Sequence, residues 1–133
     1  MKRLLLIFLF FILFLTACKH DRGIILFNSQ PITRENVLSD AKIFSIGQKV
    51  YYLFIAPNKM ENDYIRVQVF KMTDKAARGG AEVLRTKDYR LMKDERYYHS
   101  NYFAFYEKGH YVMQVFSTED FQHPLSIGDF YIK

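Results

Sequence analysis

The chain of 133 residues has a single cysteine, Cys18, and no tryptophan. One cysteine cannot form a disulfide within the chain, so burial of apolar side chains alone must stabilise the fold. The histidines are scattered, with no His-x-His or His-x-x-x-His pair, whereas a zinc site needs closely spaced ligands. We therefore expect no metal site and no cofactor.

Motifs that carry enzyme chemistry are also missing. There is no Gly-x-Ser-x-Gly, and Arg78-Gly79-Gly80 lacks the strand–glycine–helix context of a phosphate-binding loop. The paired acids Asp94-Glu95 and Glu119-Asp120 are adjacent in the chain, so they point to opposite faces of a strand or are solvated in a loop. General acid–base catalysis instead needs carboxylates held together in a cleft. We therefore expect that the protein is not an enzyme. A small enzyme with a site built across loops is the least favoured alternative.

The first residues, MKRLLLIFLFFILFLTACKH, have the features of an export signal. Lys2 and Arg3 give a short positive region, and an unbroken apolar run from Leu4 to Leu15 follows. At about 1.5 Å per residue this run is too short to span the roughly 30 Å hydrocarbon core of a bilayer. It matches the apolar region of a secretory signal peptide.

Leu15-Thr16-Ala17-Cys18 resembles the lipobox of bacterial lipoprotein signal peptides. The resemblance implies cleavage before Cys18 and attachment of a diacylglycerol to its thiol, which also explains a lone cysteine in an exported chain. It predicts a signal peptide over 1–17, a lipidated tether over 18–23 and a membrane partner through the lipid anchor. An uncleaved anchor or a non-lipidated export signal is the alternative. Lys19, in place of aspartate after the cysteine, favours the outer membrane if the host has one.

The positive charge of the mature chain is small. The whole chain has a net charge of +5, and removal of Lys2 and Arg3 leaves 19 − 2 = 17 basic against 14 acidic residues, or +3. Such a mild excess is not typical of a nucleic-acid binder, and export argues against one, so we expect no nucleic-acid partner. Between Arg66 and Arg96 basic residues outnumber acidic ones. That stretch is either a solvated face with mixed salt bridges or a patch facing anionic lipid or an acidic partner.

Strand patterns dominate residues 24–133. Tyr64 to Lys71 alternates between apolar and polar residues, as a half-buried antiparallel strand does. Lys49 to Ile55 is apolar on both faces, which favours a central strand. Further strands are expected at 24–27, 81–86, 101–107, 110–117 and 125–133, and 87–100 has no clear period. Residues 33–41 are expected to be irregular, with one helical turn capped by Thr33 as the alternative. About seven short strands without a long helix predict a single antiparallel β-sandwich over 24–133.

Two motifs refine this fold class. Phe44-x-x-Gly47-x-x-Val50-x-Tyr52 resembles an early strand of bacterial immunoglobulin-like domains, and Gly109-x-Tyr111-x-Met113 has the spacing of the immunoglobulin tyrosine corner. The cysteines and tryptophan of antibody domains are missing. The resemblance therefore implies the wider immunoglobulin-like or fibronectin-like sandwich, with structural roles for Gly109 and Tyr111, and little about activity.

Tyrosine and arginine gather around the segment from Lys87 to Tyr106. Both residue types combine apolar area with a polar tip, and interfaces are enriched in them. The candidate partner-binding residues are Arg85, Tyr89, Arg90, Arg96, Tyr97, Tyr98, Tyr102 and Tyr106. The alternative is that these tyrosines form the core and edge of a sandwich that has no tryptophan.

The sequence thus predicts a non-catalytic cell-envelope lipoprotein. Its β-sandwich is expected to act as a protein-binding or accessory subunit of an envelope complex, with another envelope protein as its partner. The second prediction is a carbohydrate- or peptidoglycan-binding module, because exposed tyrosines can stack on sugar rings.

Overall fold

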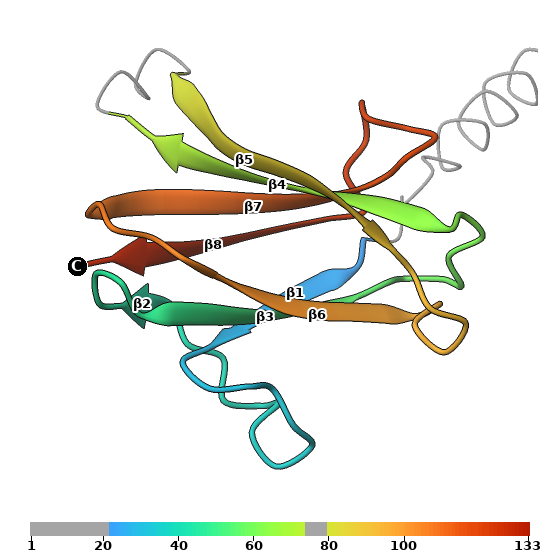
Figure 1. Ribbon diagram of the computed structural model, residues 1–133, viewed down its shortest axis with the longest axis horizontal. Coiled ribbons are helices and arrows are strands. Elements are labelled where there is room, and N and C mark those ends of the chain that lie inside the picture. The colour runs from blue at the N-terminus through green and yellow to red at the C-terminus, as the bar shows by residue number, and fades with distance from the viewer. Residues whose placement is uncertain (1–21, 74–79) are drawn as a thin grey trace, which may run out of the picture.

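The computed structural model of the protein describes residues 22–73 and 80–133. The signal peptide and lipobox predicted for 1–18 lie outside these residues. The described residues form eight strands in two sheets that pack face to face (Figure 1). The strands are β1 (Ile24–Asn28), β2 (Ile43–Phe44), β3 (Lys49–Ile55), β4 (Tyr64–Met72), β5 (Ala81–Arg90), β6 (Tyr98–Ala104), β7 (Gly109–Ser117) and β8 (Ser126–Ile132).

The order of strands is that of an immunoglobulin-like sandwich. One sheet has the order β1-β3-β6 and the other the order β2-β8-β7-β4-β5. In immunoglobulin domains strands A, B and E share one sheet and C, F and G the other, and β1, β3, β6 and β4, β7, β8 occupy these places. The predicted β-sandwich is confirmed, with eight strands where about seven were expected. One pair, β2 with β8, is parallel, so the pairing is mixed rather than purely antiparallel.

The core is built from the inward-facing residues of both sheets. Along β4 the predicted alternation is observed, with Ile65, Val67 and Val69 at most 1% exposed. Aromatic rings make up much of this core, among them Phe27, Phe103 and Phe105. The rings of Tyr111 and Phe130 stack with their centroids 5.5 Å apart. Burial of these rings is what stabilises a sandwich that cannot form a disulfide.

β5 is longer than the sequence predicted. It runs from Ala81 to Arg90, whereas the expected strand ended at residue 86. Its side chains are exposed except for the half-buried Tyr89. Because it is the edge strand of its sheet, neither of its faces is fully covered, and burial imposes no period-two pattern on its sequence.

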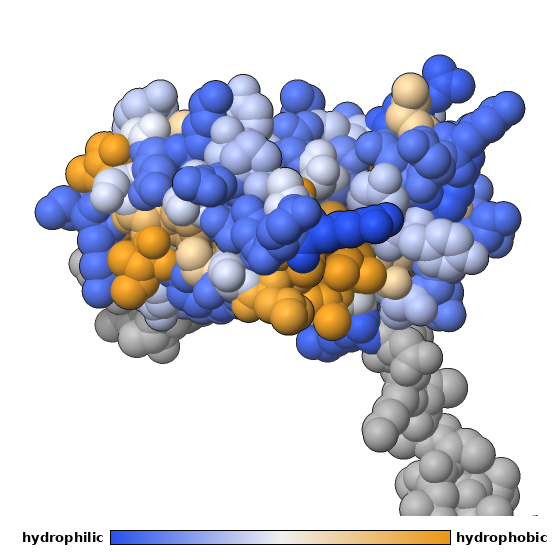
Figure 2. Space-filling view, turned by 90° about the horizontal axis from the view of Figure 1, so that it is seen from below, coloured by the Kyte–Doolittle hydropathy of each residue, from blue (hydrophilic) through white to orange (hydrophobic). Residues whose placement is uncertain are grey.

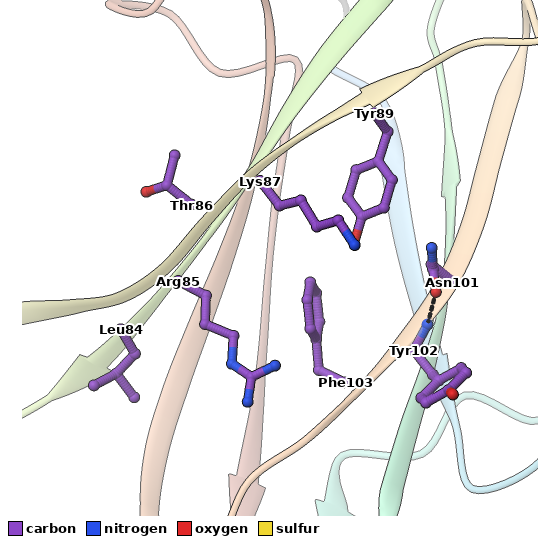
Figure 3. A pocket seen from close by; sticks show the side chains of 8 residues that line it. All are labelled: Leu84, Arg85, Thr86, Lys87, Tyr89, Asn101, Tyr102 and Phe103. Atoms are coloured by element: carbon purple, nitrogen blue, oxygen red, sulfur yellow. Dashed lines mark hydrogen bonds between the residues drawn. The ribbon is translucent and has the colours of Figure 1, made fainter.

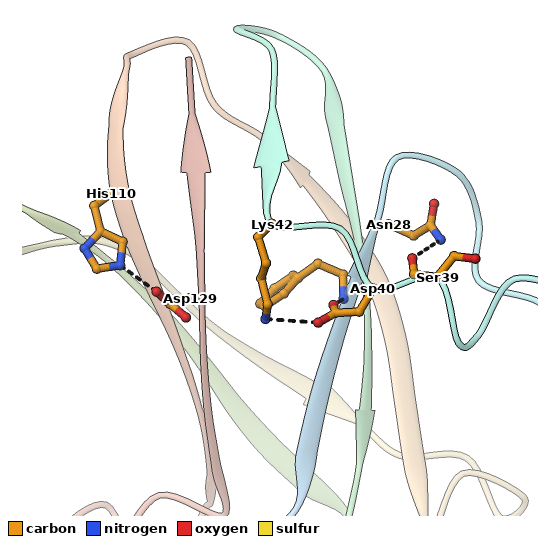
Figure 4. Close-up of polar contacts among 7 residues, drawn as sticks. Asn28, Ser39, Asp40, Lys42, His110 and Asp129 are labelled. Atoms are coloured by element: carbon orange, nitrogen blue, oxygen red, sulfur yellow. Dashed lines mark hydrogen bonds and ion pairs between the residues drawn. The ribbon is translucent and has the colours of Figure 1, made fainter.

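The segment between β1 and β2 is irregular, as expected for 33–41, and it covers the free edge of β1. The Phe27 N–H donates to Asp40 Oδ1 at 2.9 Å, and the Phe27 carbonyl accepts from the N–H of Ala41 at 2.8 Å. The Asn28 side chain donates to the Ser39 carbonyl at 3.0 Å (Figure 4). These bonds use the backbone groups that an edge strand otherwise leaves open.

The penultimate strand begins with the contact of a tyrosine corner. The Tyr111 hydroxyl donates to the carbonyl of Glu107, four residues upstream, at 2.7 Å, and the side chain is 1% exposed. Gly109 between them has a φ of 156°, a conformation that side chains disfavour. The bond therefore fixes the β6–β7 turn against the core.

Removal of that hydroxyl tests its contribution. We expect Tyr111→Phe to lower the free energy of unfolding by about 1 kcal/mol, because the Glu107 carbonyl loses its donor while the ring still fills the core. Urea denaturation followed by circular dichroism measures the change. Tyr106→Phe is the control, since Tyr106 is 73% exposed and its substitution should leave stability unchanged. Equal stability of all three proteins would contradict a structural role for the bond.

Candidate functional site

The candidate site is a groove on the open side of the sandwich, between the last strands of the two sheets. β5 ends the five-stranded sheet and β6 ends the three-stranded sheet. The two strands diverge from the turn 91–97 that joins them (Figure 1). Between them lies a hollow of about 530 Å³, which we name the β5/β6 groove (Figure 3). It is lined by Leu84, Arg85, Thr86, Lys87, Tyr89, Asn101, Tyr102 and Phe103.

Backbone edges as well as side chains face this groove. Side chains of successive residues in a strand point to opposite faces, so a sheet face is lined by alternate residues. The groove is instead bordered by the unbroken runs 84–87 on β5 and 101–103 on β6. Consecutive residues border one hollow only where the edge of the strand faces it. The groove is therefore a gap between two free strand edges.

Two cations point inward from β5. In the register with β4, Arg85 lies opposite Val69 and Lys87 opposite Val67, and both valines are fully buried. Residues that pair directly share a face of the sheet, so Arg85 and Lys87 stand on the face that packs against the core. Figure 3 shows both side chains directed from β5 toward β6.

Aromatic rings form the floor beneath these cations. The Arg85 guanidinium carbon lies 5.6 Å from the ring centroids of Phe103 and of Phe105, and the Lys87 ammonium lies 4.9 Å from the ring of Tyr89. These are cation–π distances. At the rim the Lys49 ammonium lies 4.6 Å from the ring of Tyr102. Within 22–73 and 80–133 no carboxylate forms a salt bridge with any of these three cations.

A buried histidine lies behind Tyr89 at the narrow end of the groove. His99 is 5% exposed, and its ring centroid is 4.6 Å from that of Tyr89 and 6.0 Å from that of Tyr52. Neither His99 ring nitrogen nor the Tyr52 hydroxyl has a hydrogen-bond partner among the described residues. Burial lowers the pKa of the His99 imidazole, and burial likewise raises the pKa of the Tyr52 phenol. His99 is therefore a neutral core histidine at neutral pH.

Three of the eight candidate partner-binding residues meet in the groove. These are Arg85, Tyr89 and Tyr102. The other residues that line the groove were not predicted from the sequence; they are Leu84, Thr86, Lys87, Asn101 and Phe103. Lys87 could have been predicted from its spacing to Arg85, because two cations two residues apart in a strand share a face. The remaining residues carried no signal, since their role depends on which strands end the sheets.

The other candidates lie elsewhere. Arg90 and Arg96 border a second hollow beside the turn 91–97. The Arg96 guanidinium donates to the Asn62 carbonyl at 2.8 Å and to Asp63 at 2.7 Å, so it connects two loops of the fold. Tyr97 and Tyr98 are 57% and 41% exposed, and the exposed Tyr106 follows β6 at its far end.

The other described histidines, His110 and His123, each pair with one aspartate rather than with a group of acids. His110 pairs with Asp129 at 2.8 Å across β7 and β8 (Figure 4), and His123 pairs with Asp120 at 3.0 Å. The described parts of the chain contain no group of three or more histidine, cysteine, aspartate or glutamate residues that could hold a metal ion. They also contain no helix long and apolar enough to cross a membrane.

The outer face of the three-stranded sheet carries a second surface feature, an apolar patch. Ile24 pairs with Ile55 and Leu26 with Leu53 across β1 and β3, which places all four on one face. Ile24 is 56% and Ile55 36% exposed, and both leucines are half-buried. Figure 2 views this side of the molecule and shows apolar surface near its middle.

Comparisons with known proteins give no family. No protein-family model matches the chain, and no curated protein matches it. Among solved structures, the chain is similar to the Pseudomonas fluorescens alkylpurine DNA glycosylase AlkC bound to DNA containing an abasic site analog. The TM-score is 0.43 at 13% identity, over 82% of this chain and 30% of that one. At this level the likeness carries no argument about activity.

One part of the predicted set of partners, the exclusion of nucleic acid, is contradicted by this comparison. A lipid-anchored membrane, an envelope protein and a glycan, the partners that the sequence predicted, are tested by no comparison and stay predictions. The matched structure is a protein bound to DNA. The exclusion, which depended on a mild net charge, is therefore withdrawn, because charge averaged over a chain does not describe a local groove such as the one that holds Arg85 and Lys87.

The buried histidine gives a testable pH dependence. Burial lowers the pKa of His99 in the folded state, so below about pH 6.5 the unfolded chain binds a proton that the folded chain does not. The free energy of unfolding should therefore fall as the pH drops from about 7 to 5. His99→Phe should reduce this slope, and His123→Gln, on the surface, should retain it. Salt bridges lower the pKa values of the carboxylates Asp63, Asp88 and Glu107. Their contribution to stability is therefore lost at a lower pH than the range in which His99 titrates in the unfolded chain. Equal slopes in wild type and His99→Phe, measured by urea denaturation, would contradict the assignment.

Proposed function

We propose that the chain is a non-catalytic lipoprotein of the cell envelope whose β-sandwich binds another protein through the β5/β6 groove. One observation carries the binding part of the proposal. Two inward-pointing cations, Arg85 and Lys87, stand over aromatic rings between two free strand edges, with no carboxylate in a salt bridge to them among the described residues. Cations that form no salt bridge, aromatic rings and open backbone groups are features that a protein interface can use.

The groove suits recognition better than catalysis. Its polar groups are cations, a hydroxyl, an amide and phenols, and none of its lining residues is a carboxylate or a histidine. General acid–base catalysis needs a group that can exchange a proton near neutral pH and lie in contact with the substrate. His99, the nearest such group, is enclosed behind Tyr89 rather than lining the groove.

The lipobox supports the location. Cys18 is the only thiol in the chain, and Ile24, which opens β1, follows six residues later. Six residues span at most about 20 Å, so a lipid on Cys18 would keep the sandwich close to the bilayer. Ile24 also belongs to the apolar patch formed with Leu26, Leu53 and Ile55, so this patch begins within the same short reach of the lipid.

Substitution of the cysteine tests the location. We expect Cys18→Ser to abolish incorporation of radiolabelled palmitate in a bacterial host and to move the protein from the detergent phase to the aqueous phase in Triton X-114 partitioning. The reason is that the thiol is the only attachment point for the diacylglycerol. Lys19→Ser, one residue further along, is the control and should leave both unchanged. Unchanged labelling and partitioning of Cys18→Ser would exclude a lipoprotein.

A further inference from the structure

Every open sheet has edge strands, and proteins usually protect them from pairing with other chains. Three of the four edges here are protected. β2 is two residues long and pairs only with the end of β8, and the rest of that edge carries the charge of Asp129. The segment ending at Ala41 covers β1. β5 has a register shift opposite Val69 and Phe70, and it presents inward-pointing charges. Short strands, covers, bulges and inward charges are the usual protective devices.

Within 22–73 and 80–133, β6 has none of these devices. Its seven residues, YHSNYFA, include no lysine, arginine, aspartate or glutamate. Its register with β3 is unbroken from Tyr98 to Ala104. In the seven-strand immunoglobulin arrangement a further strand, D, lies beyond the strand that β6 represents, whereas β6 ends its sheet here. β6 is therefore a regular, uncharged edge with room beside it.

The backbone groups on this edge can be identified. In an antiparallel pair, alternate residues direct their N–H and C=O toward the partner strand and away from it. The carbonyls of Tyr97 and Phe105 accept bonds from Ala56 and Gly47, which flank β3, so odd-numbered residues face β3. The even-numbered residues therefore face the groove. They are Tyr98, Ser100, Tyr102 and Ala104.

Local side chains occupy two of these edge groups. The Tyr102 N–H donates to Oδ1 of Asn101 at 2.9 Å (Figure 3), and the Ala104 carbonyl accepts from the Arg85 guanidinium at 3.4 Å. Both contacts confirm that the even-numbered groups point into the groove. Each is made by a side chain that can rotate away, so an incoming strand can replace it.

We propose that a partner protein adds an extended segment to the free edge of β6, as a fourth strand of that sheet, and presents carboxylates at alternate positions to Arg85 and Lys87. This rests on the proposed function and names the chemistry of the partner. Backbone hydrogen bonds hold the segment, as in other cases of strand addition. The cations select it.

The spacing of the acids follows from the geometry. Arg85 and Lys87 are two residues apart on one face of β5, and side chains on one face of an added strand are also two residues apart. Glutamates at i and i+2 would both face the cations, whereas glutamates at i and i+1 would place one on the outer face. An apolar segment would leave both cations buried without partners, which disfavours it.

Two peptides of equal composition test whether the spacing of the glutamates determines binding. One alternates glutamate and valine, and the other has its glutamates adjacent, with both ends blocked. Binding to the full chain in detergent is measured by fluorescence anisotropy, and protection of β6 amides by hydrogen exchange. We expect the alternating peptide to bind at least about tenfold more tightly, because it forms both charge-assisted bonds, and to protect the amides of Ser100 and Tyr102.

Variants of the protein separate the contribution of the β6 backbone edge to binding from that of the two cations. Ser100→Pro removes an N–H that faces the groove without removing one that pairs with β3, so the fold should persist and binding should be lost. Arg85→Ala/Lys87→Ala should bind both peptides equally weakly. Lys59→Ala/Lys108→Ala is its matched control, since it changes the net charge equally at exposed positions outside the groove, and it should bind like wild type.

Several results would overturn the proposal. Equal affinity for the two peptides, or binding without protection of β6 amides, would do so. Displacement of the peptide by oligothymidylate that binds more tightly would indicate single-stranded nucleic acid as the ligand. Protection of β6 that rises with protein concentration in the absence of peptide would indicate a second copy of this chain. If Ser100→Pro unfolds, the peptide comparison still decides. Palmitate labelling of Cys18 is independent of all four, so strand addition and lipidation can fail separately.

Discussion

The register between β4 and β5 is the constraint on which the candidate site depends. It places Arg85 beside Val69 and Lys87 beside Val67, and therefore turns two cations toward the interior of the sandwich. A shift by one residue would direct both to the solvent and bring Thr86 inward. Because β4 is fixed by the core on its inner face, β5 cannot slip without moving Arg85 off the rings of Phe103 and Phe105.

Those cations stabilise the open side in the free protein. Arg85 extends its apolar stem and guanidinium over Phe103 and Phe105, and Lys87 reaches the ring of Tyr89. Long basic side chains cover apolar surface while their charged ends remain in contact with water. The same side chains keep the edge of β5 from pairing with apolar strands. Protection of the edge and discrimination among partners are thus two effects of one pair of residues.

The parts of the fold that the sequence predicted are those where burial differs between two faces. β4 alternates because Ile65 and Val67 are buried while Arg66 and Gln68 are not, and this contrast is visible in the sequence. β5 lacks such a contrast, so its second half was not recognised, and Lys87 was assigned to a stretch without a period. Tyrosine and arginine content pointed to the right region, but only the order of strands shows that Tyr89 and Tyr102 face one groove while Tyr106 does not.

An edge with neither charge nor cover is unusual enough to require a reason. A sequence free to vary at Ser100 or Tyr102 could protect β6 with one lysine, as β5 does with Arg85 and Lys87. The neighbouring cations supply partial protection, since any strand that enters beside β6 must also face them. The edge then discriminates among strands instead of excluding all of them. An apolar segment would bury Arg85 and Lys87 without a charged partner and is disfavoured, whereas a segment with alternating acidic residues pairs with both. The combination of an unprotected strand edge with inward-pointing cations is therefore better explained as a site that selects acidic strands than as an edge that lacks protection.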